Sequence, residues 1–135
     1  ALDIIQKAGL PSVITIAPMG VNAMMDGVSV LDTMKELEQR GADVVGMNCF
    51  RGPETMMPYL REARKILKCH MGALPIPFRT SKDHPTFFNL PDDDSCTCPA
   101  PHGRTFPTAL DPLYCNRYEI QEFAKEASKL GINYL

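Results

Sequence analysis

Apolar runs of strand length alternate with helical segments along most of this chain, and this alternation restricts the folds open to it. The predicted strands are residues 13–17, 44–48, 69–74 and 132–135, and the longer predicted helices are residues 29–40, 53–68 and 116–130. The strand runs are largely apolar rather than alternating, which is typical of strands covered on both faces. Strands that alternate with helices predict βαβ units and a parallel sheet, so the fold class is α/β.

Residues that start or stop helices support these boundaries. Gly9 follows a short predicted helix at residues 2–8, and Gly41 and Gly131 follow the helices that begin near residues 29 and 116. Glycine is common directly after the last helical turn. Asn116 is a good N-cap residue, because its side chain can accept hydrogen bonds from the first free backbone N–H groups.

The length of the chain is the second constraint. A closed (β/α)₈ barrel typically has about 250 residues, whereas this chain has 135. A free-standing half-barrel would leave two parallel sheet edges unpaired. We therefore expect residues 1–135 to form a fragment of a larger α/β domain.

Composition excludes several classes of function. The formal net charge of −2 gives no basic surface for nucleic acid or anionic lipid, and no apolar run approaches the roughly 20 residues of a membrane span. The five cysteines are an odd number at irregular spacing, which favours free thiols in a reducing compartment and predicts a cytoplasmic protein. The sequence leaves the oligomeric state open, a homo-oligomer included.

The second predicted strand ends on an amide and a thiol. Residues 44–48 run directly into Cys49, and the sequence Phe-Arg-Gly-Pro then interrupts the run. In barrels and in open α/β sheets, functional groups gather at the carboxyl ends of parallel strands. Cys49 is thus a candidate functional residue, although a single cysteine is often only a small buried apolar side chain.

Five stretches in register resemble the homocysteine S-methyltransferase family. "GADVVGMNCFRGPETM" resembles its Gly-Xaa-Asn-Cys segment, "KAGLPSVITIAP" the strand before it and "LKCHMGALPIPFRT" the strand after it. "FFNLPD" and "FPTALDPLYCNRYEIQEFAKEASKLGINYL" resemble the last loop, helix and strand. The resemblance covers nearly the whole chain, apart from an insertion at residues 93–105.

The resemblance implies a fold and a metal site. The family folds as a (β/α)₈ TIM barrel, of which residues 1–135 would be the C-terminal half with about the last four strands. It binds one Zn²⁺ through three cysteines, and the cysteine that closes the Gly-Xaa-Asn-Cys strand corresponds to Cys49. The other two form an adjacent pair expected just after Leu135, so we expect the 135-residue chain alone to be inactive and to hold zinc weakly.

The resemblance also implies a reaction. Homocysteine would receive a methyl group and become methionine, with betaine as the donor or another onium compound such as S-methylmethionine. Zinc with three protein ligands leaves a position for the substrate thiol, and coordination removes the proton of that thiol. Aromatic faces could hold the cationic donor.

Other candidate residues have less specific signals. The Asn48 amide could orient the substrate's amino-acid end, brace Cys49 or only cap the strand. Thr15 could reach the substrate carboxylate, although a β-branched residue in a strand usually serves packing. We expect structural roles for Cys69, His70 and Cys115.

A second group of soft metal ligands occurs in the proline-rich stretch. Cys96, Cys98, His102 and Cys115 could in principle bind a metal, but their spacing fits no standard zinc pattern. We interpret them as incidental residues of an exposed loop. We expect residues 75–116, which hold eight of the twelve prolines, to lie beyond the carboxyl ends of the strands and to cover the substrate.

Two functional hypotheses remain open for this chain. The first is a zinc-dependent methyltransferase of which this chain is a part. The second is a non-catalytic, truncated or degenerate relative that serves as a structural or interaction subunit. A phosphate-binding barrel is not supported, because no glycine-rich phosphate loop occurs near the last strands.

Overall fold

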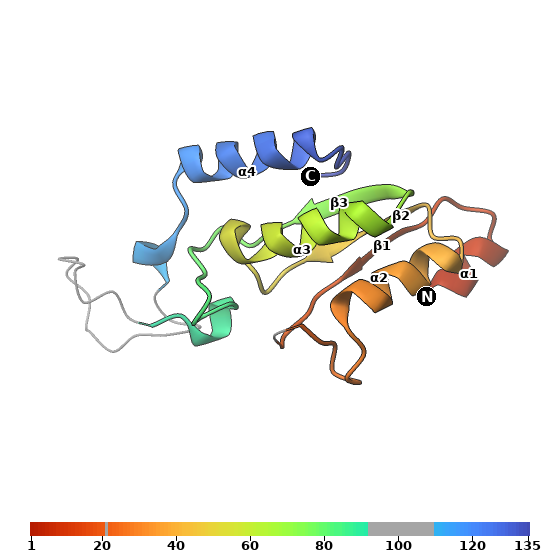
Figure 1. Ribbon diagram of the computed structural model, residues 1–135, viewed down its shortest axis with the longest axis horizontal. Coiled ribbons are helices and arrows are strands. Elements are labelled where there is room, and N and C mark those ends of the chain that lie inside the picture. The colour runs from red at the N-terminus through yellow and green to blue at the C-terminus, as the bar shows by residue number, and fades with distance from the viewer. Residues whose placement is uncertain (21, 92–109) are drawn as a thin grey trace.

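A three-stranded parallel sheet forms the centre of the structure, a computed structural model that describes residues 1–20, 22–91 and 110–135. The strands are β1 (Val13–Ile16), β2 (Val44–Asn48) and β3 (His70–Leu74), in the order β1-β2-β3 (Figure 1). Both pairs are parallel. The predicted α/β class and the parallel strands in chain order are confirmed.

The helices agree with the predicted segments to within two residues at most ends. They are α1 (Leu2–Lys7), α2 (Val30–Gln39), α3 (Pro53–Ile66) and α4 (Arg117–Lys129), with short 3₁₀ turns η1 (Phe87–Asn89) and η2 (Asp111–Leu113). Asn116 caps α4 as predicted, in a reciprocal capping box with Glu119. Within the described residues, every helix is too short or too polar to cross a bilayer.

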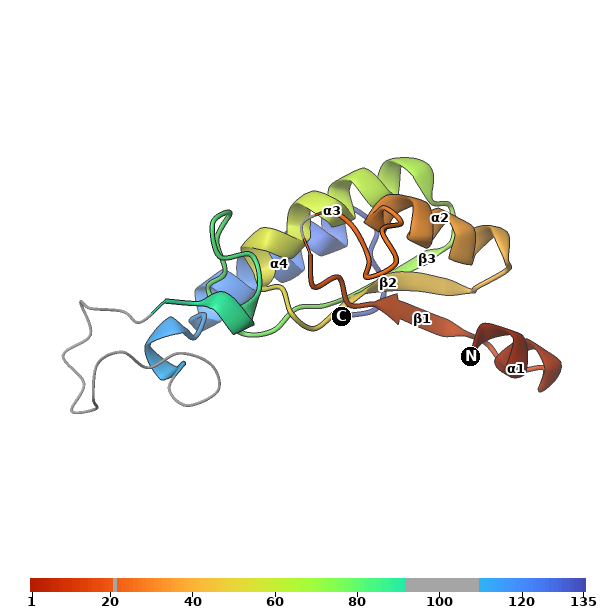
Figure 2. The ribbon, with the colours of Figure 1, turned by 90° about the horizontal axis from the view of Figure 1, so that it is seen from below.

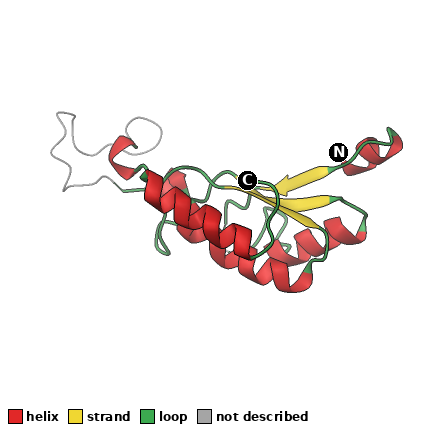
Figure 3. Cartoon of the chain, turned by 90° about the horizontal axis from the view of Figure 1, so that it is seen from above, coloured by secondary structure: helices red, strands yellow, loops and turns green. Residues whose placement is uncertain are grey.

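One face of the sheet is packed beneath helices. Val45, Met47 and Met71 point to this face and are fully buried. α2 and α3 lie over it side by side (Figure 2), and Figure 3 shows the long helices on one side of the strands. α4 packs against α3 on the side away from α2 (Figure 1). The buried methionine and leucine side chains of the helices complete the core: Met34, Met56 and Leu60.

The opposite face of the sheet carries almost no side-chain bulk at its centre. Thr15, Gly46 and Gly72 lie in register across the three strands. A methyl group at Gly46 would lie 2.1 Å from the Gly72 carbonyl oxygen, so only glycine fits there. The Tyr134 ring lies over Gly72, where a methyl group would be 3.6 Å from ring atom Cδ1.

The predicted fourth strand is present only as a single bridge. Tyr134 pairs with Gly72 in the parallel sense, and its carbonyl accepts a hydrogen bond from the Ala73 N–H at 2.8 Å. Residues 132–135 therefore start alongside β3 in the direction expected of a next strand. Regular pairing does not extend to the rest of this short segment.

Two carboxylates accept hydrogen bonds from backbone groups at the amino ends of the strands. Asp43 Oδ2 accepts hydrogen bonds from the N–H and the hydroxyl of Ser12, both at 2.8 Å, and so joins the entries of β1 and β2. Glu38 Oε1 accepts from the N–H groups of Lys68 at 2.6 Å and Cys69 at 2.7 Å, which fixes the entry of β3. These bonds hold the pKa of each carboxyl below its usual value, since they favour the charged form.

The Glu38 contact predicts an acid-dependent stability. Because the pKa of Glu38 is lowered on folding, its contribution is present above the unfolded-state pKa and is lost as the pH falls through the folded-state pKa. Glu38→Gln keeps the accepting oxygen but removes the charge. We expect it to lower the free energy of unfolding by about 1 kcal/mol at pH 7, and we expect this difference to shrink as the pH falls through the lowered folded-state pKa of Glu38.

Urea unfolding at several pH values measures this difference. Glu36→Gln on the same helix is the control. The Glu36 carboxylate forms an exposed i,i+4 pair with Arg40 at 3.6 Å, so this substitution should cost less than about 0.5 kcal/mol. A pH-independent difference for Glu38→Gln would contradict the assignment.

Candidate active site

Cys49 sits in a strained turn at the carboxyl end of β2. Cys49 and Phe50 both have positive φ, at 55° and 52°, a left-handed conformation that is costly for residues with a side chain and is concentrated at functional sites. The Cys49 thiol is free and exposed. Asn48 Nδ2 donates a hydrogen bond to Cys49 Sγ at 3.1 Å, so the amide braces the thiol in this structure.

The backbone of this turn is tied to the end of β3 and the chain that follows it. Cys49 N–H donates to the Leu74 carbonyl at 3.1 Å, and the Arg51 carbonyl accepts from the Ile76 N–H at 3.0 Å. The Phe50 carbonyl accepts from the Phe87 N–H at 2.9 Å. These bonds place residues 75–91 beyond the carboxyl ends of the strands on the Cys49 side, as predicted for this part of the loop (Figure 2).

A chain of hydroxyl groups holds Gly52, the last residue of the turn. The Gly52 N–H donates to Thr80 Oγ1 at 3.0 Å, Thr80 and Thr55 share a hydrogen bond of 2.6 Å, and Thr55 donates to the Pro85 carbonyl at 3.0 Å. Because Thr55 has one hydroxyl proton and gives it to Pro85, Thr80 must be the donor to Thr55. The approach is so close that a methyl group at Gly52 would lie 1.9 Å from the Phe78 carbonyl oxygen.

Gly52→Ala should therefore be strongly destabilising. The added methyl group meets backbone rather than a flexible side chain, so we expect a loss of about 2 kcal/mol or more in the free energy of unfolding. Gly131→Ala is the control, because Gly131 has φ of 73° with open space around it and should cost only about 1 kcal/mol of backbone strain. Chemical denaturation of both variants would contradict the close contact if Gly52→Ala were the milder change.

Aromatic side chains line the chain beside Cys49. Phe50 stacks on Phe87 with ring centroids 6.1 Å apart and lies 5.0 Å from Phe88. The row continues from Phe87 to Phe78 at 6.2 Å and from Phe78 to Tyr114 at 4.6 Å. Its Phe50 end directly follows the thiol-bearing residue, and Phe50, Phe87 and Phe88 are only partly buried.

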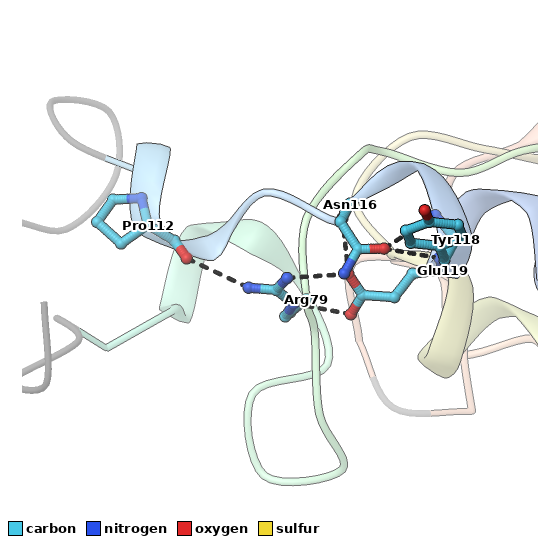
Figure 4. Close-up of polar contacts among 5 residues, drawn as sticks. All are labelled: Arg79, Pro112, Asn116, Tyr118 and Glu119. Carbon is cyan, nitrogen blue, oxygen red and sulfur yellow. Dashed lines mark hydrogen bonds and ion pairs between the residues drawn. The ribbon is translucent and has the colours of Figure 1, made fainter.

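An ion pair joins the segment that follows β3 to helix α4. Arg79 contacts both carboxylate oxygens of Glu119, at 2.7 and 2.9 Å, and its N–H donates to the Leu113 carbonyl at 2.8 Å. A third guanidinium nitrogen points to the Pro112 carbonyl at 3.4 Å (Figure 4). The Arg79 guanidinium lowers the pKa of Glu119, which also belongs to the α4 cap. The segment after β3 is thus anchored to the start of α4.

The structure separates the other sequence candidates. Thr15 lies in β1 on the face away from the helices, in register with Gly46, and it is partly buried. His70 is at the amino end of β3, exposed and paired with Asn133 Oδ1 at 3.2 Å. Cys69 and Cys115 are partly buried, and burial raises the pKa of both thiols. The structural roles expected for His70, Cys69 and Cys115 stay predictions.

The second group of soft ligands is mostly outside the described residues. Cys96, Cys98 and His102 fall there, and only Cys115 of this group is placed. Among residues 1–20, 22–91 and 110–135, no three histidine, cysteine or acidic side chains gather as a metal site. Within the described part of the chain, Cys49 thus belongs to no group of three such side chains.

Arg51 is the residue of the site that sequence reasoning missed. It lies two residues after Cys49, is 2 % exposed, and burial lowers the pKa of its guanidinium. An arginine followed by Gly-Pro is typical of an exposed turn, so the pattern gave no signal of burial. The only available hint was its position between a strand end and the start of a helix.

A groove of about 820 Å³ runs between α3 and α4. It is lined by residues of both helices and of the 78–85 segment, and by Arg51. Cys49 and Asn48 do not contribute to its lining. The groove is therefore separate from the thiol at the end of β2.

Comparison with known proteins identifies the family. The sequence model described as homocysteine S-methyltransferase matches residues 1–89. This chain belongs to that family. The resemblance read from the Gly-Xaa-Asn-Cys segment is thereby confirmed, and the match includes the whole sheet and the Cys49 turn.

The relatives include enzymes with two different methyl donors in their names. The chain is 27% identical to betaine–homocysteine S-methyltransferase 1 of Xenopus tropicalis and 29% identical to that of Danio rerio, each over the whole chain and 32% of the relative. It is 29% identical to the S-methylmethionine–homocysteine S-methyltransferase of Mus musculus, over the whole chain and 35% of the relative. The chain spans about a third of the length of these curated relatives.

Proposed function

We propose that this chain is part of an enzyme that transfers a methyl group from betaine, or a related onium donor, to the sulfur of homocysteine. The observation that carries the proposal is the exposed Cys49 thiol, held in a strained turn at the strand end within the matched family segment. Strain of this kind persists only where surrounding contacts enforce it, and here four hydrogen bonds from residues 74–87 do so.

The sheet fits one part of a (β/α)₈ barrel. Its strands are parallel and follow chain order, and the helices α2 and α3 cover one face. In a barrel, the other face, with Thr15, Gly46 and Gly72, would be the interior. The remaining strands would come from outside the described residues.

Cys49 fits the role of a zinc ligand. Its thiol is free and exposed, and Asn48 Nδ2 donates a hydrogen bond to the sulfur, which orients it. Bound Zn²⁺ would supply the positive charge that removes the proton of the homocysteine thiol. Since the described residues hold no cluster of three ligands, further ligands would come from outside them.

The reaction itself is a single displacement. A lone pair of the homocysteine sulfur forms the new bond to the methyl carbon, while the bond from that carbon to the donor nitrogen breaks. The electron pair of the broken bond stays on nitrogen, so the cationic donor leaves as a neutral amine. With a sulfonium donor the leaving group is a sulfide.

The residues of this chain would position the two reactants. Asn48 and the turn fix Cys49, and Cys49 places the acceptor sulfur at the end of β2. The Phe50 ring is partly buried and directly follows Cys49, so it offers an aromatic surface for the cationic methyl donor.

Replacement of Cys49 tests this function. Cys49→Ser in the protein that carries this chain should abolish methionine formation and zinc retention, because a serine hydroxyl is a far poorer zinc ligand than a thiolate. We would measure methionine from homocysteine with betaine and, separately, with S-methylmethionine, together with zinc per protein. Cys115→Ala is the control and should keep both activity and zinc.

The outcomes discriminate among the hypotheses. Turnover with S-methylmethionine alone would replace betaine as the donor. Full zinc and full turnover in Cys49→Ser would refute the assignment of Cys49. A wild-type protein that folds but methylates nothing would favour the non-catalytic relative.

A further inference from the structure

Arg51 is a buried cation in an unfavourable position. It is 2 % exposed, and among the described residues it makes no ion pair with a carboxylate. It also directly precedes Gly52, the N-cap of α3, where the positive end of the helix dipole opposes a second positive charge. An apolar side chain would fill the same space without these costs, so the guanidinium must do something that shape alone does not.

The guanidinium contacts two neutral groups from different elements. Its Nη2 donates to the Gly20 carbonyl at 2.5 Å, and its Cζ lies 4.8 Å from the centroid of the Tyr59 ring. Its Nε has no hydrogen-bond partner among the described residues. The side chain thus lies between the segment after β1 and the Tyr59 ring of α3.

Tyr59 also binds the segment that follows β1. Its hydroxyl accepts from the Asn22 N–H at 3.0 Å and donates to Asn22 Oδ1 at 2.8 Å. Arg51 and Tyr59 therefore hold two residues, Gly20 and Asn22, of the connection between β1 and α2. The backbone N–H of Arg51 donates a hydrogen bond to the Cys49 carbonyl at 2.6 Å.

We propose that Arg51 is a positioning residue that fixes Cys49 by bracing its turn against the segment that follows β1. The inference rests on the proposed methyl transfer for its effect on turnover. The guanidinium contacts Gly20 and Tyr59. It acts through the backbone of residues 49–51 and through Gly20, and so joins the carboxyl ends of β1 and β2 into one rigid edge.

Variants of Arg51 separate positioning from simple stability. Arg51→Met keeps the volume but loses the donors, and we expect kcat to fall at least about tenfold because small displacements of a reacting group are costly. KM for the methyl donor should stay within about twofold. Arg51→Lys keeps a donor for the Gly20 carbonyl and should recover part of kcat. Tyr59→Phe should act in the same direction, and the double variant with Arg51→Met should be less than additive.

Arg64→Met is the matched control. Arg64 also lies at α3 and donates to backbone carbonyls, those of Leu67 and Cys69, but at the opposite end of the sheet. It should lower the melting temperature about as much as Arg51→Met while leaving kcat per folded protein within about twofold. Equal kcat for Arg51→Met and wild type would overturn the proposal.

Amide hydrogen exchange gives a readout that does not depend on turnover. Arg51→Met should speed exchange of the Asn22 amide about tenfold, whereas Arg64→Met should leave that amide unchanged. Unchanged Asn22 exchange in Arg51→Met would refute the bracing even if turnover fell. If the wild-type protein transfers no methyl group, the proposed function fails, while the exchange experiment still decides the role of Arg51.

Discussion

The backbone of residues 49–52 is held by hydrogen bonds to residues 74–87, which lie at the end of β3 and directly after it. Leu74, Ile76 and Phe87 each form a backbone hydrogen bond with this turn. Thr80 Oγ1 accepts a hydrogen bond from the Gly52 N–H. Two consecutive residues of the turn have positive φ. This backbone conformation is unfavourable for residues with a side chain, so it would not persist without the contacts from the rest of the chain. The exposed thiol at Cys49 is therefore maintained by tertiary contacts, and any change that loosens residues 74–87 reaches the thiol.

The two ends of the sheet have different physical roles. At the amino ends, Asp43 and Glu38 accept backbone N–H groups in favourable geometry and stabilise the strand entries. At the carboxyl ends, the chain carries positive φ, a buried guanidinium and an exposed thiol. Stabilising contacts at one end thus coexist with unfavourable ones at the other, which is the usual division in parallel α/β proteins.

The parts of the fold that were predictable are those with local signals. Apolar runs marked β1 to β3, Gly41 and Gly131 marked helix ends, and Asn116 marked the start of α4. The position of Cys49 at a strand end also followed from the sequence. Burial of Arg51 and the hydroxyl chain from Thr80 to Thr55 did not, because each depends on residues about 25 to 31 positions apart. Residues 132–135, predicted to begin a further strand, form a parallel bridge to β3 at Tyr134.

The pairing of Gly72 with the Tyr134 ring has a consequence for sequence change. A methyl group at residue 72 would only touch the ring, so alanine fits there, whereas any longer side chain needs the volume that the ring occupies. The two positions thus share one fixed space on the open face of the sheet. Evolution can redistribute that space between a strand and the segment beside it, but a larger residue at one position requires a smaller one at the other.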